Sequence, residues 1–388
     1  MMKIPHALRT GFGNSLAAGM LTAVVLAGLN CSDPVGRAPP RSGSIGGLRL
    51  LFRVAIPGAS NTFIPVTDGV RLYADVDRRI EAFDLNTGER LWSHARPVGG
   101  PSALVPRGGR LFFAGDTAVA LDVATGQELW RRPLDSYAGF CESDGDGEAF
   151  YFGDREHRFY ALRATDGVLL WSRDLGPDWT FGGVIRGVAV SGDTLFVTAE
   201  HHTGINAHVG IAELFAIDRR TGDILWRYSE GDGSDLRVFN SPPRVAGNLL
   251  LLTNYRRNSF IAVDRTSGQE VWRVPGDPTA FGMEEPPEVS NGVAYGASHD
   301  LNAKAIELQT GRVIWTARLP SGTPYIQICG TRLLTNSHRL GVFDAATGAF
   351  LTEYPGTNGD TFLTDFSVAG NRAYVFSDEA LYAFECPT

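Results

Sequence analysis

The sequence has 388 residues, of which 43% are hydrophobic, 20% charged and 10% aromatic, and it contains 46 glycines. This composition excludes a disordered chain, and glycine above its usual frequency of about 7% indicates many tight turns rather than long helices. The formal net charge is −8, and no run of lysine or arginine occurs. Nucleic acids and anionic membrane surfaces are therefore not expected as partners.

Residues 1–30 have the layout of a secretory signal peptide. Lys3 and Arg9 precede an uncharged apolar stretch from Leu16 to Leu29, which is too short to span a bilayer comfortably. The stretch stops at Cys31, and a lone cysteine there predicts a bacterial lipoprotein whose thiol receives the lipid, so that the membrane is reached only through this anchor. Ser32 favours the outer membrane, with the protein facing the periplasm. Ordinary cleavage with release into the periplasm is the alternative.

Residues 31–47 are rich in proline and glycine and lack an apolar period, so they predict a lipid-anchored flexible tether. The body that follows contains Cys141, Cys329 and Cys386. In an oxidising compartment an odd number of cysteines leaves at least one unpaired, and the sequence does not decide which. Their spacing matches no metal-binding pattern, and buried structural thiols are the simplest expectation.

An eleven-residue phrase recurs seven times. Its first copy, AFDLNTGERLW, runs from Ala82 to Trp92. The phrase predicts a strand, a tight turn and a second strand, and its period matches that of propeller blades. The first six copies end in a tryptophan, namely Trp92, Trp130, Trp171, Trp226, Trp272 and Trp315. The seventh, Val342 to Thr352, has lost both its alanine and its tryptophan, so we expect the wedge beside it to be the loosest.

The physical role of each position in the phrase follows from its chemistry. Gly88 supplies the positive φ that a hairpin turn requires. Asp84 can accept hydrogen bonds from the turn's own amides, and Thr87 can cap the same turn. Trp92 follows on an outer strand, where a large indole can fill the wedge that opens between neighbouring blades. Burying it removes roughly 150 to 250 Å² of aromatic surface from water.

The two ends of the body complete one blade together. Residues 362–385 predict only three strands, the last of them Leu381–Glu385. The segment from Leu48 to Pro57 resembles the tryptophan strand of the other copies, with Phe52 in the tryptophan position. Residues 48–388 therefore predict an all-β, eight-bladed propeller of four-stranded antiparallel blades. Pairing the N-terminal strand with the C-terminal blade closes the ring and removes its free edges.

The A-x-D-x-x-T-G-x-x-x-W phrase resembles the tryptophan-docking motif of the PQQ-like β-propeller family. This family includes quinoprotein dehydrogenases, which hold pyrroloquinoline quinone and Ca²⁺ on the axis. It also includes the propeller lipoprotein of the outer-membrane β-barrel assembly machinery, which binds no cofactor and works as a docking scaffold. The chain is closer to the lipoprotein in size and layout. Fold alone does not choose between them.

The resemblance implies specific residues for a dehydrogenase, and the chain departs from them. Those enzymes are much larger, carry an adjacent pair of disulfide-bonded cysteines beside the cofactor, and place an acid, an amide and a catalytic aspartate around Ca²⁺. No Cys-Cys pair occurs here. We therefore expect no catalytic residues and no cofactor, with pyrroloquinoline quinone and Ca²⁺ as the alternative. His201, His202 and His208 lack a carboxylate or thiol at a matching spacing, so no metal is expected.

Loop length indicates where a partner would bind. The Thr-Gly turns share one face of the ring, whereas the opposite face has long, irregular loops in blades 3 to 6. Irregular loops on a rigid scaffold commonly carry binding. We expect an envelope protein or peptide to dock on this face through aromatic anchors with an acidic rim. The candidate residues are Trp179, Phe181, His201, His202, Phe239, Asn240, Phe281, Met283, Glu284 and Glu285.

These patterns together predict a monomeric, non-catalytic scaffold protein of the bacterial envelope, with a role in outer-membrane protein assembly as the nearest family function. Two alternatives remain open. One is a periplasmic PQQ-dependent oxidoreductase, and the other is a surface module that binds glycan or another envelope component.

Overall fold

The computed structural model describes residues 44–56, 65–96, 103–138, 143–204, 210–231, 238–277, 280, 286–320, 325–336, 338–357 and 359–388. The chain divides into two compact units, residues 1–38 and residues 39–388, and every described residue belongs to the second. The predicted signal peptide, the predicted lipidation site Cys31 and residues 32–43 of the predicted tether lie outside the described residues. Within the described ranges, no helix has the length and apolar character needed to cross a membrane.

The described strands form eight four-stranded antiparallel sheets, one for each blade. Blade 1 contains β2 (Val66–Thr67), β3 (Arg71–Val76), β4 (Arg79–Asp84) and β5 (Arg90–Ala95). Blade 2 contains β6 (Val105–Arg107), β7 (Arg110–Ala114), β8 (Thr117–Asp122) and β9 (Glu128–Pro133). Blade 3 contains β10 (Asp144–Gly145), β11 (Ala149–Gly153), β12 (Arg158–Arg163) and β13 (Leu169–Asp174). Blade 4 contains β14 (Gly183–Ser191), β15 (Thr194–His202), β16 (Gly210–Asp218) and β17 (Ile224–Glu230).

The remaining four blades follow the same order from inner to outer strand. Blade 5 contains β18 (Arg244–Ala246), β19 (Leu249–Asn254), β20 (Ser259–Asp264) and β21 (Glu270–Pro275), with the short 3-10 helix η2 (Tyr255–Arg257) between β19 and β20. Blade 6 contains β22 (Glu288–Ser290), β23 (Val293–Ser298), β24 (Asn302–Glu307) and β25 (Val313–Arg318). Blade 7 contains β26 (Tyr325–Cys329), β27 (Arg332–Asn336), β28 (Leu340–Asp344) and β29 (Phe350–Tyr354). Blade 8 contains β30 (Ser367–Ala369), β31 (Arg372–Phe376), β32 (Ala380–Glu385) and β1 (Arg49–Ala55).

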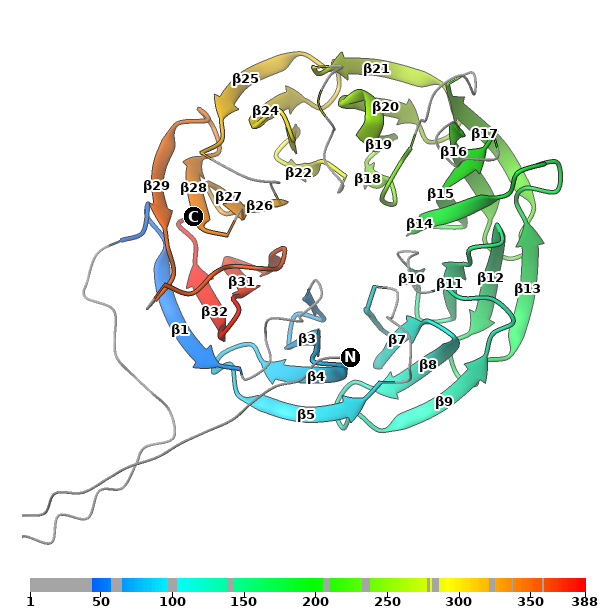
Figure 1. Ribbon diagram of the computed structural model, residues 1–388, viewed down its shortest axis with the longest axis horizontal. Helices are drawn as coiled ribbons and strands as arrows, with labels where there is room; N and C mark the ends of the chain where they lie inside the picture. The colour runs from blue at the N-terminus through cyan, green and yellow to red at the C-terminus, as the bar shows by residue number, and fades with distance from the viewer. Residues whose placement is uncertain are drawn as a thin grey trace, which may run out of the picture. The chain divides into compact units, whose positions relative to one another are not determined.

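The eight sheets are arranged in a ring, which confirms the predicted propeller (Figure 1). The strand β1 lies at the outer rim between β29 and β5 (Figure 1). It pairs antiparallel with β32, in a register that places Arg49 opposite Glu385 and Ala55 opposite Ala380. Because the first strand of the body is hydrogen-bonded to the last, blade 8 is built from both ends of the chain.

The repeated turn has the hydrogen bonds that its sequence predicts. In blade 1 the carboxylate of Asp84 accepts from the backbone N–H groups of Asn86 (2.8 Å) and Thr87 (2.9 Å). The Thr87 hydroxyl accepts from the N–H of Glu89 at 3.2 Å, and Gly88 adopts a φ of +71°. The polar residues of the phrase therefore satisfy the turn's own backbone, as Asx and Thr turns do.

Each docking tryptophan packs across the junction onto the turn of the next blade. The indole N–H of Trp92 donates to the carbonyl of Val123 at 3.0 Å, and the Trp130 indole donates to Ala164 at 2.8 Å. A Cβ added to the facing glycine would lie only 2.5–2.7 Å from the indole at all six junctions, so these positions require glycine. The facing glycines are Gly126, Gly167, Gly222, Gly268, Gly311 and Gly348.

The two junctions that flank blade 8 depart from this arrangement. Phe52 packs on Gly88 of blade 1, where an added Cβ would lie 2.6 Å from its ring. At the junction between blades 7 and 8, Thr352 faces Gly46, which precedes β1. Residues 44–47 were predicted as part of the flexible tether, but Ile45 forms a β-bridge with Leu48 and this turn packs on blade 7. Residues 44–47 therefore belong to the folded body, not to the predicted tether.

Candidate functional site

Blade 4 extends beyond its neighbours at the irregular-loop face. The strands β14, β15 and β16 each have nine residues, whereas β11 and β12 of blade 3 have five and six. The additional residues lie at the β15–β16 connection, because His202 pairs with Gly210 beyond the end of the common register. This extended end of blade 4, together with the segment 175–183 that leads into it, is the candidate site.

Trp179 is the centre of the site, and it is buried rather than presented to solvent. Its side chain packs in a core between blades 3 and 4 with Leu175, Ile185 and Phe215. Added Cβ atoms on Gly176 and Gly183 would both collide with the indole, so these glycines make the space that Trp179 occupies. The buried indole of Trp179 therefore fixes the segment 175–183 against the core.

Two histidines contact the indole from different blades. The ring of His201 stacks on Trp179 with a centroid distance of 4.9 Å and an interplanar angle of 8°. His157, from the β11–β12 turn, approaches the edge of the indole at 5.5 Å. The Nδ1 of His157 lies 2.8 Å from a carboxylate oxygen of Asp174, which fixes the orientation of the imidazole. Trp179 thus contacts blade 3 through the edge-on ring of His157 and blade 4 through the stacked ring of His201.

A buried carboxylate lies beneath the histidine stack. Glu213 is fully buried and accepts hydrogen bonds from Arg227 Nε and Ser229 Oγ, both at 2.7 Å. His201 Nδ1 lies 3.7 Å from Glu213, which is an ion-pair distance but too long for a hydrogen bond. Burial lowers the pKa of His201, and Glu213 opposes this shift only in part. His201 is therefore biased toward its neutral form.

A second ion pair lies beside the first. Glu200 is buried, pairs with Arg186 and lies 3.2 Å from Nε2 of His202. Both carboxylates, Glu200 and Glu213, are thus held by arginines of the same blade. The acidic rim predicted from the sequence consists of Glu284 and Glu285, which lie outside the described residues, as do Phe281 and Met283.

The structure divides the remaining candidates. Phe239 is buried and stacks against Tyr228, with ring centroids 6.4 Å apart, in the core between blades 4 and 5. Trp179 and Phe239 are thus core residues, and the expectation that they act as exposed anchors is corrected. Asn240 is half-buried. Phe181 is 45% exposed and directly follows the Trp179 segment, so it is the one described aromatic of this set available to a partner.

Sequence reasoning did not single out His157, Glu213 or Arg227. Glu213 carried a signal, because a carboxylate interrupts an otherwise apolar run from Ile211 to Ile217. An acid at such a position is buried only when a cation or several donors hold it. His157 carried no comparable signal, because its contact with Trp179 joins two different blades.

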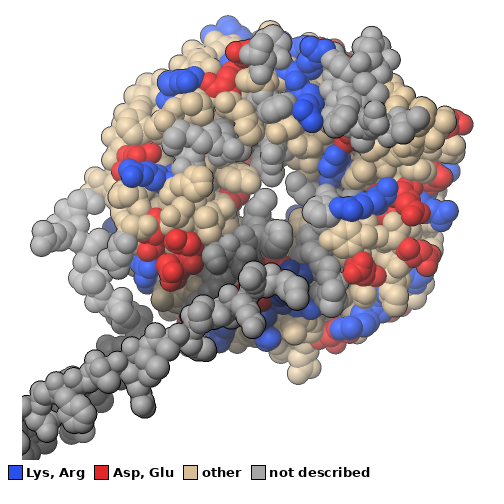
Figure 2. Space-filling model, viewed as in Figure 1, with Lys and Arg blue, Asp and Glu red and all other residues tan. Residues whose placement is uncertain are grey.

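Acidic and basic side chains are mixed around the ring on the face seen in Figure 2, and neither sign forms a continuous field there. Across the described residues, many charged side chains are paired between neighbouring blades. Examples are Arg273 with Glu230 at 2.7 Å and Arg219 with Asp146 at 2.5 Å.

The described residues do not fit the cofactor site of the dehydrogenases. No group of three or more His, Cys, Asp or Glu within the described ranges is positioned to hold a metal ion. The disulfide that the structure contains joins Cys329 to Cys386, which are 57 positions apart, rather than two adjacent cysteines.

The ring of eight sheets and its indole-on-glycine junctions define a tryptophan-docked β-propeller. The family model described as outer membrane protein assembly factor BamB matches residues 49–140, 76–316 and 155–385. The chain belongs to this family.

Curated relatives include outer membrane protein assembly factors BamB from Yersinia pestis and Burkholderia pseudomallei. The first is 22% identical over 64% of this chain and 62% of its own length. The second is 23% identical over 69% of this chain and 70% of its own length. The match therefore spans about three fifths of the Yersinia protein. A polyvinylalcohol dehydrogenase from Sphingopyxis is 20% identical over 64% of this chain and half of its own length.

Solved structures show the same fold. BamB from Moraxella catarrhalis superimposes with a TM-score of 0.67 at 15% identity, covering 87% of this chain and 99% of that one. The quinohemoprotein alcohol dehydrogenase from Comamonas testosteroni gives a TM-score of 0.66 at 15% identity, covering 88% and 78%. The fold is thus shared by BamB and by an alcohol dehydrogenase, so the fold alone does not determine the function of this chain.

Proposed function

We propose that the protein is a non-catalytic scaffold in outer-membrane protein assembly, held at the periplasmic side of the outer membrane by a lipid on Cys31. The family match and the relatives' role as outer membrane protein assembly factors support this proposal. The described residues include the extended end of blade 4, which offers a surface for docking.

The extended end of blade 4 is the proposed docking surface for an envelope protein or peptide. The observation that carries this proposal is Phe181, which is 45% exposed although the segment beneath it is held by the buried Trp179. An exposed aromatic on a preorganised segment is suited to be a binding anchor, because little conformational freedom is lost when it is buried in a partner. We expect the ring to act as a monomer.

The test is affinity capture from the native envelope with wild-type protein and two single variants. Phe181→Ala should lower the yield of the captured assembly partner at least tenfold. Phe350→Ala is the matched control, because Phe350 is a phenylalanine of similar exposure (51%) on the outer strand of blade 7. Equal capture by wild type and Phe181→Ala would overturn the docking surface, and a tenfold loss for Phe350→Ala would move it to another part of the ring.

A second measurement addresses the two other function classes. Purified protein is mixed with pyrroloquinoline quinone and Ca²⁺, and in parallel with envelope glycans. We expect neither a new absorbance band nor a shift of the melting temperature in either mixture. A stoichiometric absorbance change with the quinone would replace the scaffold proposal with an oxidoreductase, and a thermal shift with glycan would replace it with a glycan-binding module.

A further inference from the structure

The junction between blades 7 and 8 lacks the interaction that holds six other junctions. In blade 1, Ala82 of β4 pairs with Trp92 of β5, and the equivalent pair in blade 7 is Val342 with Thr352. Threonine has neither an aromatic ring to fill the wedge nor an indole N–H to donate across it. The space between the blades is instead approached by Gly46, whose added Cβ would lie 3.1 Å from the Thr352 methyl group.

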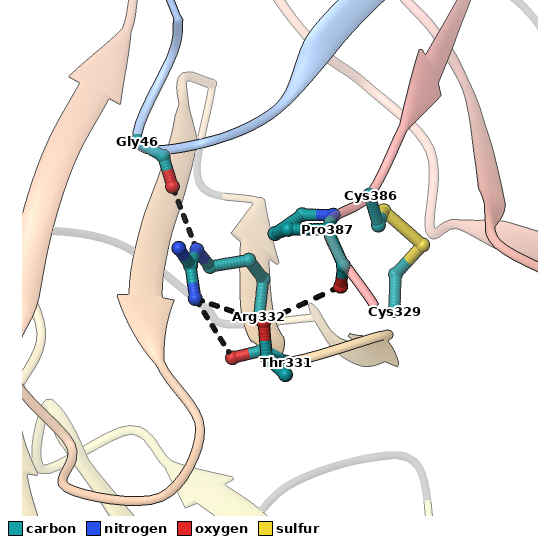
Figure 3. Close-up of a disulfide and its surroundings, with 6 residues drawn as sticks. All are labelled: Gly46, Cys329, Thr331, Arg332, Cys386 and Pro387. Atoms are coloured by element: carbon teal, nitrogen blue, oxygen red, sulfur yellow. Dashed lines mark hydrogen bonds between the residues drawn. A yellow bond between two sulfur atoms is a disulfide. The ribbon is translucent and has the colours of Figure 1, made fainter.

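Covalent and polar contacts from both ends of the body meet at this junction. The disulfide joins Cys329, the last residue of β26, to Cys386, which follows β32 (Figure 3). The backbone N–H of Thr331 donates to the carbonyl of Pro387 at 3.0 Å. From the N-terminal side, Arg332 Nε donates to the carbonyl of Gly46 at 2.7 Å (Figure 3). The turn between β26 and β27 therefore holds both ends of blade 8.

We propose that the Cys329–Cys386 disulfide is a redox-formed latch that replaces the missing tryptophan dock and secures the composite blade 8 against blade 7. The latch occurs where the docking residue is lost, and it acts on the only described blade assembled from both ends of the chain. That blade is completed by β1, which pairs with β32 across 336 residues, the separation of Arg49 from Glu385, and the disulfide ties the end of β32 to blade 7. Such long-range pairing carries a large loop-closure entropy.

Formation of the latch removes two protons and two electrons from the two thiols. One cysteine thiolate attacks the disulfide of a dithiol–disulfide oxidant and forms a mixed disulfide. The second cysteine thiolate then attacks the sulfur of the first cysteine in that mixed disulfide. This forms the bond between the two cysteines and releases the oxidant as its dithiol. Both cysteines are almost fully buried in the closed ring, at 1% and 2% exposure. The exchange therefore takes place before or during closure, and the finished bond is shielded from small thiols.

The proposal is tested by amide hydrogen exchange of the full mature chain. Four samples are compared: oxidised wild type, wild type folded with its thiols kept reduced, the Cys329→Ser/Cys386→Ser variant, and the control Cys141→Ser. Reduction and the double substitution should each speed exchange in β1 and β32 at least tenfold while leaving blade 2 unchanged. The control should match oxidised wild type. The reduced wild type keeps the test valid if the double variant does not fold.

A rescue variant tests whether a docking tryptophan in blade 7 can replace the disulfide. Adding Val342→Ala and Thr352→Trp to the double cysteine variant restores the Ala–Trp pair of the other blades. This variant should bring exchange in β1 and β32 back to within about threefold of oxidised wild type. The proposal is overturned if loss of the disulfide leaves exchange in these strands unchanged, if it speeds exchange equally in all blades, or if the rescue variant restores nothing.

Discussion

The hydroxyl of Tyr374 donates a 2.9 Å hydrogen bond to the carbonyl of Leu85. At six other junctions the equivalent carbonyl accepts from an indole N–H, but Phe52 stands in the tryptophan position here and cannot donate. Tyr374 comes from β31 of the same blade, and its ring lies 6.5 Å from that of Phe52. The two functions of one tryptophan are thus divided between two residues: Phe52 fills the wedge, and Tyr374 supplies the donor.

Removing this donor should destabilise the junction between blades 8 and 1. Tyr374→Phe leaves the buried Leu85 carbonyl without its partner, which costs about 1 to 3 kcal/mol of unfolding free energy. Chemical denaturation measures the loss. Phe52→Trp in the same background should recover most of it, because an indole N–H can then reach the carbonyl. If Tyr374→Phe proved as stable as the wild type, this hydrogen bond would contribute nothing to the free energy of unfolding.

At each junction where an indole packs on a glycine, substitution of either residue should destabilise the protein. Trp130 is 8% exposed, so Trp130→Ala should cost about 3 to 5 kcal/mol of unfolding free energy, whereas Trp130→Phe should mainly lose the bond to Ala164. Gly167→Ala should also destabilise, because Gly167 has a φ of +70° and its Cβ would lie 2.7 Å from the indole. Gly69→Ala is a useful comparison: it shares a positive φ, but nothing lies near its added Cβ.

Substitution of Trp179 should lower stability, whereas substitution of Phe181 should affect binding but not stability. Because Trp179 packs in the core between blades 3 and 4, Trp179→Ala should lower the melting temperature and cost about 3 to 5 kcal/mol. Phe181→Ala should change the unfolding free energy by less than about 0.5 kcal/mol, as is usual for exposed positions. Thermal unfolding of the two variants decides the matter. A stable Trp179→Ala would contradict the burial of this indole.

His201, which stacks on Trp179, should make the free energy of unfolding depend on pH. Burial lowers the pKa of His201 below its ordinary value of 6.5, so the folded protein binds fewer protons than the unfolded chain just below pH 6.5. The contribution of His201 is therefore complete above about pH 6.5 and falls as the pH drops toward its folded pKa. Among the nearby charges, Glu213 opposes this shift and Arg227 reinforces it.

Denaturation between pH 5 and 8 checks this expectation. His201→Gln should be less stable at pH 8 and should show a flatter slope between pH 5 and 6.5. Part of the slope should remain, because burial also lowers the pKa of His94 in blade 1. An identical slope in wild type and His201→Gln would show that His201 does not titrate in this range.

The sequence contained the repeat, the turn chemistry and the blade count, because these depend on residues close together in the chain. Asp84, Thr87 and Gly88 build one turn through their own backbone, and seven copies with one shared blade are enough to predict a ring. The same local pattern placed the docking residues from Phe52 to Trp315 on outer strands, where the structure has them.

Contacts between distant segments were decided only by the tertiary structure. From the sequence, Trp179 was predicted to be an exposed binding residue on a loop. In the structure it is buried, because Gly183 of its own segment leaves room for it and Phe215 and His201 of blade 4 pack against it. Three cysteines allowed several pairings, and the packing of blade 8 on blade 7 selected Cys329 with Cys386. Tyr374 could take over an indole's hydrogen bond only because ring closure brings it within reach of Leu85, 289 residues away. Periodicity encodes what a strand does within its blade, whereas these contacts arise from how the blades meet.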